Sequence, residues 1–217
     1  DLAGAIPLLE RAARAQPDEP GILRVLLGAI VRDQEVRAAH RVTLEERVRG
    51  GGADAVDRFL LGVIRHYANE FEASNQLLRP LESKLDHEDR LHIYIAMNDF
   101  NLERVGDALV RLDRASRRTA PDPDIYYCLA EILRDTDRHR ALKELRRYAN
   151  LSQGDVLSNP SKEVRIQGLV AGLEACLKDG RARCEGEWEH PRLREEKEDI
   201  YVDLKRDIAA AVVLLLV

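Results

Sequence analysis

The sequence predicts an all-α protein in which helical hairpins follow one another in tandem and a long helix closes the chain. Two observations predict this fold. First, a short apolar motif recurs every 34 residues, reading LLGAI from Leu26, LLGVI from Leu60, YIAMN from Tyr94 and CLAEI from Cys128. Second, each copy is followed by an amphipathic stretch and then by turn-forming residues, which is the pattern of paired helices.

Length and charge narrow the classes of function. A chain of 217 residues can bury a substantial core without metals or disulfides. The 34 basic and 39 acidic residues give a net charge of -5, which argues against nucleic acid as a partner. Only 6 of the basic residues are lysines, and this excess of arginine favours a GC-rich bacterial genome.

The cysteines leave the compartment open. Cys128, Cys176 and Cys184 are too few for a disulfide framework and fit a reducing compartment. The alternative is an exported protein with one bridge between Cys176 and Cys184. The expected location is therefore the cytoplasm or a membrane surface, with the periplasm as the alternative.

The first helix of each unit is marked by a large residue followed by a small one. In a frame that starts at Gly21, Ala55, Asp89 and Pro123, the seventh place is always large and apolar, and the eighth is always small. The eighth places are Gly28, Gly62, Ala96 and Ala130. A small residue at a fixed place predicts a helix that a second helix approaches closely, with apolar neighbours at helical spacing.

A second amphipathic helix is expected in every unit, starting at Glu35, Glu70, Glu103 and Arg138. The segments GGGAD, DHED, APDPD and SQGD then provide turns or caps. Because no single hairpin can bury its own apolar face, the four hairpins are predicted to stack on one another.

This pattern resembles the tetratricopeptide repeat family, whose unit is a helix, turn and helix of 34 residues. The opening segment AIPLLERAARAQP resembles the second helix of such a repeat, with Ala5, Leu9, Ala12 and Pro17 at the expected places. The family's aromatic at the fourth place is present only as Tyr126, and the closing proline is missing from most copies. The resemblance implies a right-handed α-solenoid.

Three regions are expected along the chain. Residues 1–152 form the repeat array, with half a repeat at 1–20 and four hairpins after it. Residues 153–190 hold a divergent capping helix, from Ser161 to Lys178, and a loop. Residues 191–217 form the C-terminal helix. A start on a second helix and an apolar ending suggest that the chain is part of a longer protein.

The C-terminal helix changes character along its length. It is amphipathic until Lys205 and Arg206, and from Ile208 it is apolar on all sides. Cations at such a change commonly mark a membrane interface. The helix therefore either begins a membrane anchor or packs against the solenoid or a second copy, and ten apolar residues alone are too few to span a bilayer.

The resemblance also implies a concave groove lined by inner places of the first helices. The groove would be apolar and aromatic in its middle and would suit an apolar peptide or helix. The alternative is that Phe59, Ile93 and Tyr127 are ordinary packing residues. The predicted lining residues are Val25, Arg32, Val56, Phe59, Val63, His66, Tyr67, Ile93, Met97, Asn101, Tyr127, Glu131 and Arg134.

No catalytic residue, metal site or cofactor is predicted. His87 and His92 are five residues apart, which places them on different sides of a helix, and both are expected on the surface. The acidic cluster around Trp188 is expected to be solvated.

The predicted function is a non-catalytic scaffold that binds a protein or peptide partner, with its C-terminal helix as a membrane tether. Two alternatives stay open: a structural subunit or assembly factor of a membrane complex, and the regulatory solenoid of a larger enzyme.

Overall fold

The computed structural model describes residues 2–16, 19–31, 33–152 and 160–179 of the chain. This part of the protein is entirely helical and contains no β-strand, so the all-α prediction is confirmed. The helices are α1 (Leu2–Ala15), α2 (Pro20–Val31), α3 (Gln34–Arg49), α4 (Ala55–Tyr67), α5 (Phe71–Leu78), the 3-10 helix η1 (Arg79–Leu81), α6 (Glu82–Leu85), α7 (Asp89–Asn101), α8 (Val105–Ala115), α9 (Asp124–Leu133), α10 (Arg138–Ser152) and α11 (Pro160–Asp179).

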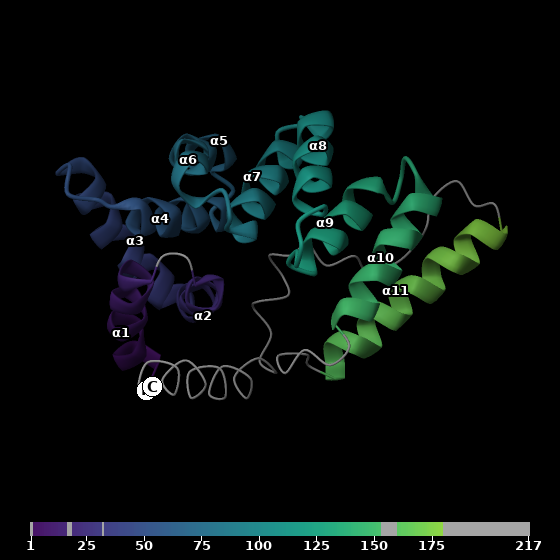
Figure 1. Ribbon diagram of the computed structural model, residues 1–217, viewed down its shortest axis with the longest axis horizontal. Helices are drawn as coiled ribbons and strands as arrows, with labels where there is room; N and C mark the ends of the chain where they lie inside the picture. Colours follow the sequence, from purple (N-terminus) through teal and green to yellow (C-terminus); the bar gives the residue numbers. More distant parts are fainter. Residues whose placement is uncertain (1, 17–18, 32, 153–159, 180–217) are drawn as a thin grey trace.

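Helices that are neighbours in sequence pack on one another. Figure 1 shows them crossing the molecule in chain order, from α1 and α2 at one side to α10 and α11 at the other. The closest partners are α4 with α5, α7 with α8, and α9 with α10. The first helices of successive pairs also touch, since α7 contacts both α4 and α9. Each pair is therefore completed by the next one.

The observed helices lie where the sequence predicts both halves of each hairpin, with one exception. The expected single helix from Glu70 is divided into α5, η1 and α6. Pro80 explains the interruption, because proline has no amide hydrogen and its ring clashes with the preceding turn of an α-helix. The chain tightens into the 3-10 helix at this proline and then resumes as α6.

The turn inside a helix pair is repeated 34 residues apart. Asn69, between α4 and α5, has φ of 62°, and Glu103, between α7 and α8, has φ of 63°. In each turn the next amide donates to a carbonyl oxygen five residues earlier, Glu70 to Arg65 at 2.9 Å and Arg104 to Asp99 at 2.8 Å. Left-handed backbone is common at helix C-termini but unusual for glutamate. Two units thus share the same backbone turn.

Three of the four small residues of the predicted frame are buried, and Gly28 is partly exposed. Gly62, Ala96 and Ala130 are buried. A Cβ atom added to Gly62 would lie 2.5 Å from Cδ2 and 2.7 Å from Cγ of Leu78, so α5 approaches α4 as closely as a glycine permits. Leu112, 34 residues after Leu78, is also fully buried.

Helix α7 takes part in two hydrophobic cores. Leu91, Tyr94 and Ile95 pack with residues of the preceding helices. Ile93, Ala96 and Met97 belong to a second cluster that continues to α11. A helix that faces apolar neighbours on both sides buries most of its circumference, including its polar side chains.

Candidate functional site

The predicted groove positions are mostly inside the core. Val25 and Arg134 are partly exposed, Asn101 is exposed, and Arg32 lies outside the described residues. The expected apolar strip is therefore packed, as the alternative interpretation of Phe59, Ile93 and Tyr127 requires. The buried positions are Val56, Phe59, Val63, His66, Tyr67, Ile93, Met97, Tyr127 and Glu131.

Aromatic contacts account for part of this burial. The ring of His66 lies edge-on to three rings, those of Tyr67, Phe71 and Tyr94, at centroid distances of 5.5, 5.7 and 5.2 Å. Phe59 also meets Tyr94 edge-on, at 6.5 Å. Edge-to-face pairs of this kind stabilise a core beyond the burial of their area. These rings join α4, α5 and α7.

A buried chain of hydrogen bonds crosses the same three helices. Nδ1 of His66 lies 2.7 Å from Oδ1 of Asn98. Nδ2 of Asn98 donates to Oγ of Ser74 at 2.8 Å and to Oδ1 of Asn75 at 2.9 Å. The hydroxyl of Ser74 donates to the carbonyl oxygen of Gly62 at 2.7 Å. Because the amide nitrogen of Asn98 is the donor, its oxygen accepts the proton that Nδ1 of His66 carries.

The chain continues to a fully buried carboxylate. Nδ2 of Asn75 donates to Oδ1 of Asp99 at 2.9 Å. Nη2 of Arg79 reaches both oxygens of Asp99, at 2.7 and 2.8 Å, and supplies the compensating charge. A buried network that is satisfied in this way fixes helix positions, whereas a partly satisfied one is costly.

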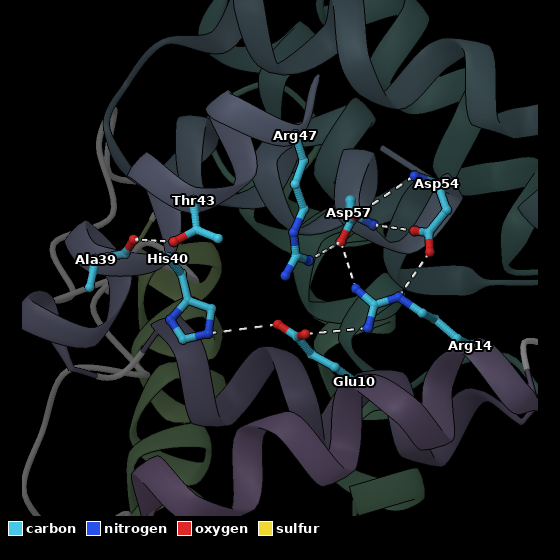
Figure 2. A network of polar contacts seen from close by, with 8 residues as sticks. All are labelled: Glu10, Arg14, Ala39, His40, Thr43, Arg47, Asp54 and Asp57. Atoms are coloured by element: carbon cyan, nitrogen blue, oxygen red, sulfur yellow. Dashed lines mark hydrogen bonds and ion pairs between the residues drawn. The ribbon is translucent and has the colours of Figure 1, made fainter. Parts of the chain in front are cut away.

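A second network joins α1, α3 and α4. Figure 2 shows the guanidinium of Arg14, from α1, pointing at two carboxylates at the start of α4, with Nη2 2.7 Å from Asp57 and Nε 2.8 Å from Asp54. Nη1 of Arg47, from α3, lies 2.9 Å from the same Asp57 oxygen. Asp54 and Asp57 also form a capping box that satisfies the first turn of α4. The buried Asp57 carboxylate therefore binds two arginines.

The outer part of this network is weaker. Glu10 lies 3.3 Å from Nη1 of Arg14 and 3.7 Å from Nε2 of His40, as Figure 2 shows. Thr43 donates to the carbonyl oxygen of Ala39 within α3, at 3.4 Å. Burial alone would lower the pKa of Arg14, but hydrogen bonds to Asp57 and Asp54 outweigh it and raise the pKa. Arg14 is thus a fixed cation between α1 and α4.

A third cluster surrounds His92, and here the expectation of a surface histidine is wrong. His92 is buried with 3% exposure, whereas His87 is exposed as expected. Nε2 of His92 lies 2.9 Å from the carbonyl oxygen of Asp86 and 2.9 Å from Nη2 of Arg118. His92 lies near the start of α7, which packs against α8, and this packing encloses its ring.

Glu88 lies beside this cluster at the N-terminus of α7. Its Oε1 accepts a hydrogen bond from the amide of Arg90 at 2.9 Å. Its Oε2 is buried and has no hydrogen-bond partner in the part of the chain that the structure describes. Burial raises the pKa of the Glu88 carboxyl, against the hydrogen bond and charge of Arg90.

Metal, thiol and membrane features can be stated only for the described ranges. There, no group of three or more His, Cys, Asp or Glu side chains has the arrangement of a metal site. Cys128 is a buried free cysteine, and Cys176 is disulfide-bonded, while Cys184 lies outside the described residues. None of the helices in these ranges combines the length and apolarity of a membrane span. Lys205, Arg206, Ile208 and Trp188 lie outside the described residues.

Sequence reasoning missed the buried polar residues. Ser74, Asn75, Asn98 and Asp99 are all at most 2% exposed, yet none was predicted to matter. One signal was present, because Asn98 and Asp99 stand directly after the apolar run YIAM in a helix expected to be buried. Polar side chains in such a position require partners.

Searches of protein families, curated proteins and solved structures find no match to the chain. The tetratricopeptide resemblance therefore stays a prediction that depends on the spacing of the repeated residues.

Proposed function

We propose that the chain is a non-catalytic protein-interaction scaffold: a right-handed solenoid of tetratricopeptide-like hairpins that holds a protein or peptide partner on its inner face. The repeated turn is the observation that supports this proposal most directly. Asn69 and Glu103 adopt the same left-handed backbone 34 residues apart, with the same hydrogen bonds around them. Identical turns orient successive helix pairs alike, and stacking such units produces an extended surface for binding.

The packing revises which residues contact the partner. Phe59, Tyr67 and Tyr127 stabilise the array, because they are buried among neighbouring helices. Partner contacts then fall on the inner positions that are accessible, Val25, Asn101 and Arg134. Since two of these three are polar, the partner is expected to present polar groups beside its apolar ones.

Site-specific photocrosslinking in cells that naturally express the protein tests the proposal. A benzophenone amino acid is placed at Asn101 or Arg134, on the inner face, and at Val42 or Val110, on second helices with exposures of 57% and 71%. The proposal expects one discrete protein adduct from the inner positions and none from Val42 or Val110. Equal adducts from all four positions, or no protein adduct at all, would contradict it.

A further inference from the structure

The ring of His92 is buried, and an arginine faces each of its two nitrogens. The ring lies at the start of α7, and the polar groups around it come from the connection before α7, from α8 and from the turn after α8. Arg111 of α8 and Arg118 of the turn after it approach the two ring nitrogens. Nη2 of Arg118 lies 2.9 Å from Nε2, and Nη1 of Arg111 lies 3.5 Å from Nδ1.

These contacts require a neutral ring. A guanidinium can only donate hydrogen bonds, so a ring nitrogen that faces one must offer a lone pair. With the proton on Nε2, His92 donates to the carbonyl oxygen of Asp86, 2.9 Å away, and Nδ1 faces Arg111. With the proton on Nδ1, Nε2 accepts from Arg118. An imidazolium has no lone pair for either arginine and would face two partly exposed guanidiniums, with the Asp86 carboxylate 3.4 Å from Nε2 as the opposing charge.

We propose that His92 is an acid-sensitive latch: protonation of its ring releases Arg118 and Arg111 and loosens α8 and the following turn from the start of α7. Arg118 carries the effect onward. Its Nη1 donates to Asp89 at 2.8 Å, and the other oxygen of Asp89 accepts the backbone amide of Asp122 at 2.7 Å. The turn that leads into α9 is therefore tied to Asp89, the same carboxylate that Arg118 binds.

The neighbouring charges agree with the direction of the switch. Burial lowers the pKa of His92, and the charges of Arg118 and Arg111 lower it further, while the carbonyl and carboxylate of Asp86 oppose them. The latch therefore contributes fully to stability above the ordinary histidine pKa of about 6.5, and the contribution is lost as pH falls through the lowered value. The charged groups that face the cluster are Glu82, Asp86, Glu88, Asp89, Arg90, Arg111, Arg114, Arg118 and Asp122.

Amide exchange of the whole chain tests this latch, with protection factors corrected for the intrinsic effect of pH. Between about pH 7.5 and pH 5, amides of α8 and of residues 116–122 should lose about tenfold in protection, while α4 and α5 change less. His92→Gln, which keeps a neutral donor and acceptor, should abolish the difference. His87→Gln, at the exposed histidine five residues earlier, should leave the difference unchanged.

A measurement on the wild type makes the test independent of whether His92→Gln folds. The NMR shift of the His92 ring should titrate with the same midpoint as the α8 amides, and this midpoint should lie below the ordinary histidine value of about 6.5. The latch is refuted if α8 protection stays constant while the ring titrates, if the loss persists in folded His92→Gln, or if His92 titrates no lower than an ordinary histidine, at about 6.5.

Discussion

Nδ1 of His66 in α4 and Oδ1 of Asn98 in α7 lie 2.7 Å apart, and both side chains are buried. This bond joins the first helices of two successive pairs, which also meet through apolar contacts and through the hydroxyls of Tyr67 and Tyr94, 3.4 Å apart. A buried polar contact with a single satisfied arrangement selects one register between two helices. We therefore regard Asn98 as the residue that sets how α7 sits on α4.

Asn98→Ala should destabilise the protein by about 2–4 kcal/mol, because it leaves His66, Ser74 and Asn75 without a shared partner in the core. Equilibrium unfolding in urea, followed by circular dichroism, measures this loss. Asn101→Ala, on the same helix but exposed, is the matched control and should change the free energy of unfolding by less than about 0.5 kcal/mol. Equal losses in the two variants would show that the network contributes little.

Gly62→Ala should also be destabilising, here by overpacking. The added methyl group would lie 2.5 Å from Cδ2 of the fully buried Leu78, and a cost of about 1–3 kcal/mol is expected when a packed core must move. Gly106→Ala is the control, because Gly106 in α8 has nothing within 4 Å of an added Cβ. That change should stabilise the protein by about 0.5–1 kcal/mol, since alanine is the better helix former.

The sequence predicted the helices and their order. It did not predict which polar and inner residues are buried between neighbouring helices. Amphipathic spacing and the 34-residue period placed every hairpin, because both depend on local pattern. Only Pro80 introduced a break that the pattern of apolar residues did not show. The 34-residue period also identifies residues that hold the same position in successive units. Asn69 and Glu103 are such a pair, and both have positive φ.

The residues that pack α7 could not be assigned in the same way. His92 was expected on the surface because it is polar, yet α7 contributes to two cores and buries His92, Asn98 and Asp99. Likewise, the sequence left open whether Phe59 and Tyr127 line a groove or pack in the core, and both are buried. How far a neighbouring unit covers an inner residue depends on the geometry between units, which the pattern within one helix does not specify.

The Arg14 and Asp57 pair should be energetically coupled more strongly than a surface ion pair. Asp57 is buried and Arg14 is 31% exposed, so water screens their 2.7 Å contact only in part. We expect a coupling of about 1–2 kcal/mol in a double-mutant cycle. This value allows for Arg47, which also binds Asp57 and partly replaces Arg14 when that residue is removed. The control pair is Arg146 and Glu174, exposed to 58% and 45%, which should couple by less than about 0.5 kcal/mol. A coupling no larger than that of the control would contradict the structural role of Arg14.

Ionisation of the Glu88 carboxyl should lower the free energy of unfolding as pH rises. Burial raises the pKa of its carboxyl above the unfolded value, so its contribution is present below about pH 4.3 and is lost as pH rises through the folded value. The ionised carboxylate then has one buried oxygen without a hydrogen bond in the described part of the chain. A substitution that removes the charge of Glu88 but keeps an acceptor for the Arg90 amide should abolish this loss of stability.

Glu88→Gln should therefore gain stability relative to the wild type as pH increases from about 4 to 7, whatever the constant cost of burying the amide. Urea unfolding of both proteins across this range gives the difference in the free energy of unfolding at each pH. The same comparison in a His92→Gln background removes the titration of His92, because Glu88 lies beside that cluster and its charge affects the ring. Glu46→Gln, at an exposed position of α3, controls for the loss of one carboxyl group. A difference that is flat, or that falls as pH rises, would mean that the Glu88 carboxylate is compensated in the folded protein.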